Sequence, residues 1–478
     1  MTGDGDNRDD ADSAGSAGSA DSADNESRGG GRRPVTGSWE GFGWRDDTVP
    51  QAPLDDSTRS RLDLPSTLRP VADARAVQRS VFEPALKQYG NAYRAADPRF
   101  ADRQVEQAWR EARRTALDLV LAAVADSVWG DSLVLRGSVL LRAWFGGAAR
   151  EPGDLDFVVT PASWRIEEAR TSAMLDGIAE AAEAAARRAG TAVRIDAAGA
   201  VSDEIWTYDR VPGRRLVLPW TAEGLPGGTV QLDFVFNESL PAAPEATPLP
   251  AMTGDTRILL NAATAELSLA WKIMWLWTDT HPQGKDLYDA VLLAEYTPLR
   301  YELLRQVFLL AEPSDACRPV GLDEIASLAQ TVEWNHFIAE YPDVTGNEAD
   351  FAGRLSAALA PTFRTALSDA GEDGEYARTV WWLEPRIRAY REVLHRKSLR
   401  TAQKQMHADG LPAFAAVVIT RELLGSGHHS LQDARDALFD APAWRRVADV
   451  YGRCRRWLDD ELARLEDTDA ARSVPDAD

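Results

Sequence analysis

The pattern of apolar and polar residues changes character along the chain. Residues 1–60 have few apolar positions and contain the near-repeat SAGSAGSADSAD, which predicts a disordered acidic tail. From residue 61 to residue 261, short apolar runs bounded by glycine and proline alternate with amphipathic stretches, as in a unit that mixes strands and helices. Residues 262–466 follow a helical period, and residues 467–478 form an acidic tail. The pattern therefore predicts an α+β core followed by a C-terminal α-helical domain.

Individual elements follow from the same pattern. Helical periodicity predicts helices at residues 71–86, 100–128, 138–145, 164–188, 265–277, 285–294 and 300–310, with further helices at 351–465. Short apolar runs predict strands at residues 132–135, 154–160, 192–196, 215–218 and 229–236.

Composition narrows the class of protein. With 478 residues, of which 44% are apolar, the chain has enough core for two to four domains at roughly 100–200 residues each. Two cysteines and six scattered histidines offer no zinc-ligand spacing and suit a reducing compartment. The first residues lack a secretion signal, and apolar runs such as 414–419 are far shorter than the ~20 residues of a membrane span. We therefore expect a cytoplasmic protein without a membrane partner.

The charge of the chain limits its binding to nucleic acid. Asp and Glu number 75 against 53 Lys and Arg, a net charge of −22, whereas nucleic-acid binders are usually basic. Any RNA site must therefore be local. The best local candidate is the basic run at residues 386–404, although a solvated helix face is the preferred explanation of such a run. Its basic residues are Arg386, Arg388, Arg391, Arg396, Lys397, Arg400 and Lys404.

Two aspartates in the predicted strand 154–160 are the first chemical signal. Residues two apart on a strand point to the same face, so Asp154 and Asp156 project together and Leu155 projects to the opposite face. Two adjacent carboxylates repel each other unless they are well solvated, one is protonated, or a cation lies between them. An isolated pair of this kind is usually only a solvated strand end.

Neighbouring residues favour a metal site. Gly137 and Ser138 follow a strand and begin a helix, where free N–H groups and the helix dipole favour a phosphate. Asp233 lies on another apolar strand, and a buried carboxylate there is costly without a partner, although it could simply face water. Three carboxylates beside such a turn can hold two Mg²⁺ ions for nucleotidyl transfer, with Asp154 and Asp156 near the triphosphate. Asp233 would then lie near the attacking hydroxyl and could take its proton.

Over residues 131–293 the sequence resembles the AbiEii/AbiGii toxin branch of the DNA polymerase beta-type nucleotidyltransferase superfamily. The resemblance implies a mixed-sheet nucleotidyltransferase core, a nucleotide contact for Lys272 and a catalytic requirement for Asp286. Two positions depart from the branch pattern: Arg136 replaces a glycine, and Pro152 replaces a Ser or Thr, which affects the expected phosphate turn and substrate positioning. The motifs that carry the resemblance are Leu135-Arg136-Gly137-Ser138, Arg150, Asp154-Leu155-Asp156, Asp233, the pair Glu266 and Lys272, and Lys285-Asp286-Leu287-Tyr288-Asp289.

The residues themselves support these last roles only weakly. Arginine outnumbers lysine 48 to 5, so a lysine at position 272 indicates that a compact ammonium is required, or arises by chance. Asp286 and Asp289 share a helix face, which also suits an acidic first turn stabilised by the helix dipole. Trp271 and Trp275 share a face as well, and core packing is preferred there to stacking on a base.

The sequence therefore predicts an enzyme with two Mg²⁺ ions and an NTP as donor, which transfers a nucleoside monophosphate to an acceptor hydroxyl. The resemblance implies RNA as the acceptor, such as a tRNA 3′ end, a role as toxin in a toxin–antitoxin or phage-defence system, and a cognate antitoxin. Two alternatives stay open. One is a catalytically silent fold that acts as a binding or regulatory protein, and the other is an enzyme that nucleotidylates proteins or small molecules.

Overall fold

The computed structural model describes residue 49 and residues 54–207, 211–311, 316–369, 374–453 and 456–470. The chain divides into two units, Met1–Pro34 and Val35–Asp478, and all described elements lie in the second. Most of the predicted N-terminal tail and most of the C-terminal tail fall outside the described residues. The first described helix begins at Asp56, slightly before the predicted start of the ordered chain at residue 61.

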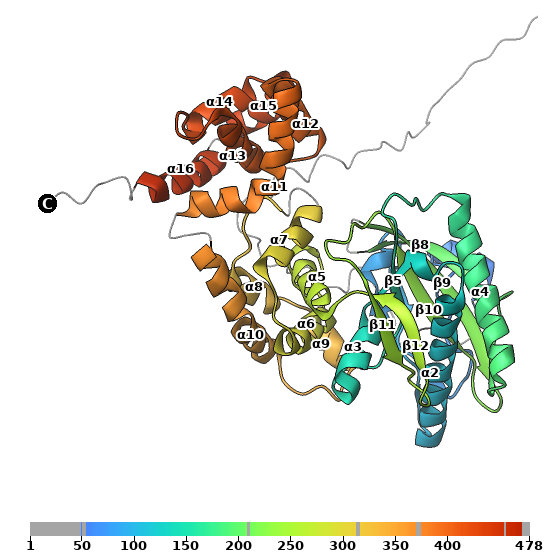
Figure 1. Ribbon diagram of the computed structural model, residues 1–478. Helices are drawn as coiled ribbons and strands as arrows, with labels where there is room; N and C mark the ends of the chain where they lie inside the picture. Colours follow the sequence, from blue (N-terminus) through green and yellow to red (C-terminus); the bar gives the residue numbers. More distant parts are fainter. Residues whose placement is uncertain are drawn as a thin grey trace, which may run out of the picture. The chain divides into compact units, whose positions relative to one another are not determined.

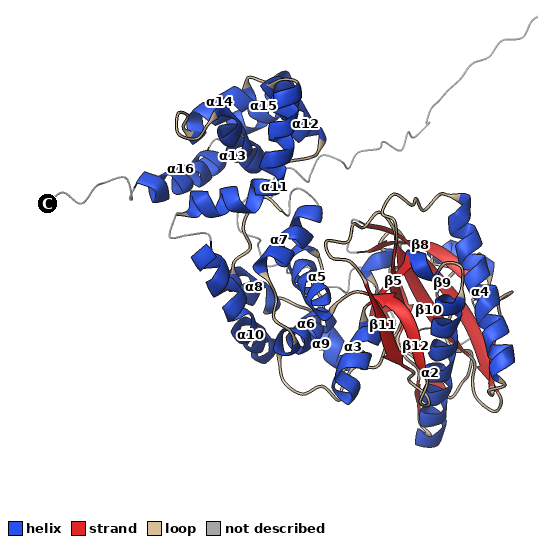
Figure 2. Cartoon of the chain, in the orientation of Figure 1, coloured by secondary structure: helices blue, strands red, loops and turns tan. Residues whose placement is uncertain are grey.

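Described strands are confined to residues 76–262. Figure 2 draws strands in red and helices in blue. They are β1 (Ala76–Val77), β2 (Ser80–Phe82), β3 (Tyr93–Ala95), β4 (Arg99–Phe100), β5 (Leu133–Arg136), β6 (Leu155–Val159), β7 (Val193–Ile195), β8 (Val201–Thr207), β9 (Val211–Ala222), β10 (Gly228–Val235), β11 (Glu245–Pro250) and β12 (Arg257–Ala262). Helices that precede or accompany them are α1 (Asp56–Leu62), α2 (Arg103–Asp126), α3 (Ser138–Phe145) and α4 (Ala169–Ala189), with short 3-10 turns at Pro84–Leu86, Gly130–Ser132 and Gly146–Ala148.

After β12, the named elements of the described chain are all helices. They are α5 (Ala265–Thr278), α6 (Gly284–Tyr296), α7 (Tyr301–Leu310), α8 (Leu322–Ala329), α9 (Trp334–Glu340), α10 (Glu348–Asp369), α11 (Glu375–Arg396), α12 (Leu399–Ala408), α13 (Ala413–Leu424), α14 (Leu431–Phe439), α15 (Arg445–Arg453) and α16 (Arg456–Ala470), with a 3-10 turn at Pro442–Trp444. None of the described helices is long and apolar enough to cross a membrane.

A mixed sheet forms the centre of the α/β part. Its strand order is β11-β12-β5-β6-β10-β9-β7, and β8 pairs with the other end of the long strand β9. Strands β6 and β10 are parallel, as are β12 and β5, and the other pairs are antiparallel. Helices α2 and α4 pack against each other and against this sheet (Figure 1). The predicted mixed-sheet core followed by a helical region is confirmed.

The register of the sheet determines where the candidate carboxylates lie. Asp156 on β6 is directly opposite Asp233 on β10, and opposite Arg136 on β5. Because side chains alternate along a strand, these residues share one face of the sheet. Leu155 and Phe234 point to the other face, where they are fully buried in the hydrophobic core. Packing on that face therefore fixes the strands that carry the carboxylates.

One predicted helix is wrong. Residues 71–86 form the short strands β1 and β2 and a 3-10 turn, rather than a helix. Ala76 is fully buried whereas Val77 is exposed, which is the alternation of a strand. Strand β1 pairs with β4, and the side chain of Gln78 donates to the carbonyl of Ala96. These partners are distant in the sequence, so a local helical period could not reveal them.

Three strands of the central sheet were not anticipated, and neither were the short strands β3 and β4. Strand β11 lies at an edge of the sheet and contains Pro248 and Pro250, which remove backbone donors and weaken the strand signal. Strands β8 and β12 are the other two. The helix predicted at residues 164–188 begins later, at Ala169, because Trp164 belongs to the preceding turn, where its indole donates to Thr171.

Candidate active site

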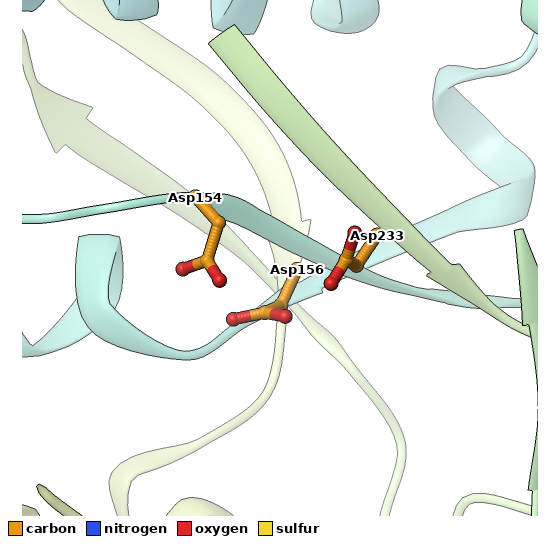
Figure 3. Close-up of side chains that lie close together, drawn as sticks. All are labelled: Asp154, Asp156 and Asp233. Atoms are coloured by element: carbon orange, nitrogen blue, oxygen red, sulfur yellow. The ribbon is translucent and has the colours of Figure 1, made fainter. Parts of the chain in front are cut away.

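Three aspartates from neighbouring strands converge in one cluster. Asp154 immediately precedes β6, Asp156 lies on it, and Asp233 lies on β10, and their side chains leave the sheet on one side (Figure 3). One carboxylate oxygen from each residue lies within 4.8 Å of the other two. The grouping predicted from the sequence is therefore present, and its ligand atoms are all oxygens, as Mg²⁺ prefers.

The electrostatics of this cluster suit a bound cation. The pKa of Asp156 is raised to about 8, mainly by burial and in addition by the negative charges of Asp154 and Asp233. Burial would also raise the pKa of Asp154, but nearby cations, led by Lys285, outweigh it and hold that pKa below its usual value. A divalent cation would favour the ionised form of all three carboxylates, so the donor set fits such an ion.

The glycine turn between β5 and α3 touches this cluster. Gly137 has a φ of +83°, and a Cβ placed on it would lie 2.2 Å from Oδ2 of Asp156. Only glycine permits both the backbone conformation and this close approach. Ser138 begins α3 and is fully buried, yet its Oγ has no hydrogen-bond partner among the described residues. A buried hydroxyl of this kind is suited to a ligand at the helix N-terminus.

Arg215 is an unpredicted member of the site. It lies on β9 directly opposite Asp233. Its Nε donates to Oδ1 of Asp233 and its Nη2 to Oδ2, and each of these hydrogen bonds is 2.8 Å long. Burial still raises the pKa of Asp233, although Arg215 acts against this. Glu83, which follows β2, lies 3.7 Å from Arg215 and 3.3 Å from Arg94. The register of β9 and the fold of the N-terminal segment bring these residues here, and no local motif marks them.

Lys272 and Asp286 lie together in a buried ion network. Nζ of Lys272 on α5 is 2.7 Å from Oδ1 of Asp286 and 2.9 Å from Oδ2 of Asp289, both on α6. The guanidinium of Arg150 donates to both oxygens of Asp289: Nε lies 3.1 Å from Oδ1, and Nη2 lies 3.1 Å from Oδ2. Lys272 is only 5% exposed and Asp286 only 1%. The network therefore joins α5 and α6 to the loop that leads into Asp154.

Arg136 does not disrupt the turn that follows it. Its guanidinium lies 5.3 Å from the ring centroid of Trp271 and 5.1 Å from that of Trp275, and it pairs with Glu238 at 2.8 Å. The two indoles are stacked and buried, which confirms that they serve core packing. Where a glycine was expected, this chain thus has an arginine held by aromatic rings and a carboxylate.

The basic run at residues 386–404 spans α11 and α12. Arg388 pairs with Glu384 one turn earlier, and Arg396 pairs with Glu392. Arg391 is exposed to solvent. These features suit the preferred explanation of a solvated helix face, and RNA binding there stays a prediction.

Part of the sequence matches a known protein family. The sequence model of the family described as nucleotidyl transferase AbiEii toxin, type IV TA system, matches residues 119–369, a little over half of the 478 residues. That range contains every residue predicted for the site. A search of curated proteins found no match. The chain therefore belongs to the AbiEii nucleotidyl transferase toxin family of type IV toxin–antitoxin systems.

Proposed function

We propose that the protein is a Mg²⁺-dependent nucleotidyltransferase that moves a nucleoside monophosphate from an NTP to an acceptor hydroxyl. The observation that supports this most strongly is the cluster of Asp154, Asp156 and Asp233 against the Gly137 turn. When bound there, two Mg²⁺ ions would neutralise the charge that develops on the attacking and leaving oxygens of an in-line displacement.

The residues of the chain have separate tasks in this reaction. The backbone N–H groups at the start of α3 and the hydroxyl of Ser138 bind phosphate oxygens of the donor. The acceptor oxygen attacks the α-phosphorus as pyrophosphate leaves, and Asp233 takes the proton of the acceptor. Arg215 holds both oxygens of Asp233 and thereby fixes the orientation of that carboxylate.

Lys272 and Asp286 act as positioning residues in the described conformation. Both are buried, and Lys272 is bound to two carboxylates of α6. Asp289 connects them to Arg150, four residues before Asp154. If activity requires Asp286, the reason is that Asp286 supports, through Lys272 and Asp289, the loop that carries Arg150 and leads into Asp154. A nucleotide contact by Lys272 requires its ammonium to exchange one carboxylate for a phosphate oxygen.

The type IV toxin–antitoxin family indicates a toxin with a cognate antitoxin as partner. We propose an RNA 3′ hydroxyl, such as that of a tRNA, as the acceptor. A protein or small-molecule acceptor is the other outcome to test, because the chain as a whole is acidic and its best basic run is largely a solvated helix face.

The test is to incubate the purified protein with Mg²⁺ and each α-labelled NTP in bacterial lysate, with and without RNase. Label on RNase-sensitive material is expected, and it should disappear in Asp154→Asn. The matched control is Asp176→Asn, which removes an exposed carboxylate on α4 and should leave labelling unchanged. RNase-resistant label on a polypeptide would move the acceptor to protein. Equal labelling by Asp154→Asn and wild type would contradict the proposed site.

A further inference from the structure

A polar cavity of about 100 Å³ adjoins the carboxylate cluster on the side of Asp154. One wall is the sheet, through Arg215 and Val217 of β9 and Thr229 and Gln231 of β10. A second wall comes from residues 67–98, which lie outside the stretch matched by the family, at 119–369. A single water needs roughly 10–15 Å³ by this measure, so the chamber has room for several waters or for a phosphate group.

The charge of the chamber is opposite to that of the protein. Its lining includes six cationic side chains and three carboxylates, in a chain of net charge −22. A cluster of cations in a recess of an acidic protein concentrates anions there. The cations are Arg69, Arg94, Arg113, Arg150, Arg215 and Lys285, and the carboxylates are Asp97, Asp154 and Glu340.

Most of these cations already have partners. Arg113 pairs with Asp97 at 2.6 Å, and Arg94 pairs with Glu340 at 2.7 Å. Arg150 and Arg215 bind carboxylates of the site. Even the exposed Arg69 donates to a backbone carbonyl.

Lys285 differs from the others. Within the part of the chain that the structure describes, its ammonium has no hydrogen bond and no ion pair within 4 Å. It is the second residue of α6, so it adds its charge to the positive end of a helix of 13 residues. Burial would lower its pKa, but the charges of Glu83 and Asp286 outweigh burial and keep Lys285 protonated at neutral pH.

We propose that this chamber binds a phosphate group of a substrate, and that Lys285 is the cation that holds it. Residues 67–98 close the chamber over the bound group, so the N-terminal segment contributes directly to substrate binding. The phosphate comes from the donor triphosphate or from the acceptor. The inference rests on the proposed function only in assigning the phosphate to a substrate, because anion binding itself requires no transfer.

The test is calorimetric titration of the 478-residue chain with inorganic tripolyphosphate and Mg²⁺. Lys285→Gln should weaken binding by about 10- to 100-fold, which is typical for loss of one charge-assisted hydrogen bond. Lys285→Arg should keep most of the affinity. Arg188→Gln, which removes an exposed cation on α4, should bind like wild type. A thermal melt of each variant checks that the fold is retained.

Two further titrations distinguish the sources of the phosphate. If a non-hydrolysable NTP analogue loses affinity in Lys285→Gln, the chamber holds the phosphates of the donor. If only a short RNA with a 3′ hydroxyl loses affinity, it holds a phosphate of the acceptor. The proposal is overturned if wild type does not bind tripolyphosphate, or if Lys285→Gln binds it equally well. Absence of nucleotidyl transfer with intact tripolyphosphate binding would remove the proposed function and leave the anion site.

Discussion

Asp289 should be among the most important charges for stability, although it is not a predicted ligand of metal or nucleotide. It is fully buried on α6 and accepts from both Arg150 and Lys272. Asp289→Asn keeps the shape of the side chain but leaves Arg150 without its carboxylate and Lys272 with only Asp286. Removing one partner of a buried ion pair costs about 3–5 kcal/mol, so we expect a loss of unfolding free energy of that size.

Urea unfolding at pH 7 measures this loss, and α6 supplies a matched control. Glu295 pairs with Arg354 on the surface, with side chains 43% and 45% exposed, so Glu295→Gln should cost less than about 1 kcal/mol. A loss in Asp289→Asn no larger than that of the control would refute the argument that the network is held together by charge.

The pH dependence of the same variant provides an independent check. Burial would raise the pKa of Asp289, but the charges of Arg150 and Lys272 outweigh it and hold the pKa below its usual value. The stabilisation is therefore complete above the unfolded-state pKa of about 3.9 and is lost as pH falls through the lower folded-state pKa. The difference between wild type and Asp289→Asn should stay constant from pH 8 to about pH 5 and shrink in stronger acid.

Three further predictions concern the site and its surroundings. Gly137→Ala should abolish labelling, because the added Cβ would collide with the side chain of Asp156. The control is Gly190→Ala, where φ is also positive (+63°) but a Cβ would meet no other atom within 4 Å; it should cost about 1 kcal/mol of stability and leave labelling intact. Mg²⁺ at ten times its Kd should stabilise wild type by about 1.4 kcal/mol in a thermal melt, reversibly with EDTA, and an equal gain in Asp156→Asn would exclude the carboxylate cluster as the metal site. Replacing Arg391 and Arg400 together by Gln should change stability by less than about 0.5 kcal/mol and leave RNA labelling intact, and a weaker salt dependence of RNA binding would contradict the solvated-face interpretation.

The sequence was most informative where chemistry and local periodicity coincide. Asp154 and Asp156 are two apart, so their common face followed from alternation alone. Asp233 was marked as the carboxylate that interrupts another apolar strand, and the register of β10 with β6 then places it on the same face. The tight turn at Gly137 followed from its place between a strand and a helix. The structure adds the quantitative reason for this glycine, which is the 2.2 Å approach of a Cβ to Asp156.

Long-range pairing placed the residues that the sequence did not reveal. Arg215 reaches Asp233 only because β9 pairs with β10 in one register, and a shift of one residue would turn its side chain to the other face. Glu83 lies in a segment predicted to be helical, so its approach to Arg215 could not be anticipated. Lys285 belongs to a recognised motif, but that its ammonium has no hydrogen-bond or ion-pair partner among the described residues is visible only once its neighbours are placed in space.

A line of alternating charges connects the N-terminal segment to the site. Asp233 binds Arg215 at 2.8 Å, Glu83 lies 3.7 Å from Arg215 and 3.3 Å from Arg94, and Arg94 pairs with Glu340 at 2.7 Å. Each inner charge in this line has neighbours of opposite sign on both sides, so removing one leaves buried charges uncompensated. Glu83 and Arg94 precede the matched family region, and a protein reduced to that region would lose both. The electrostatic balance of the candidate active site therefore depends on residues that the family match does not include.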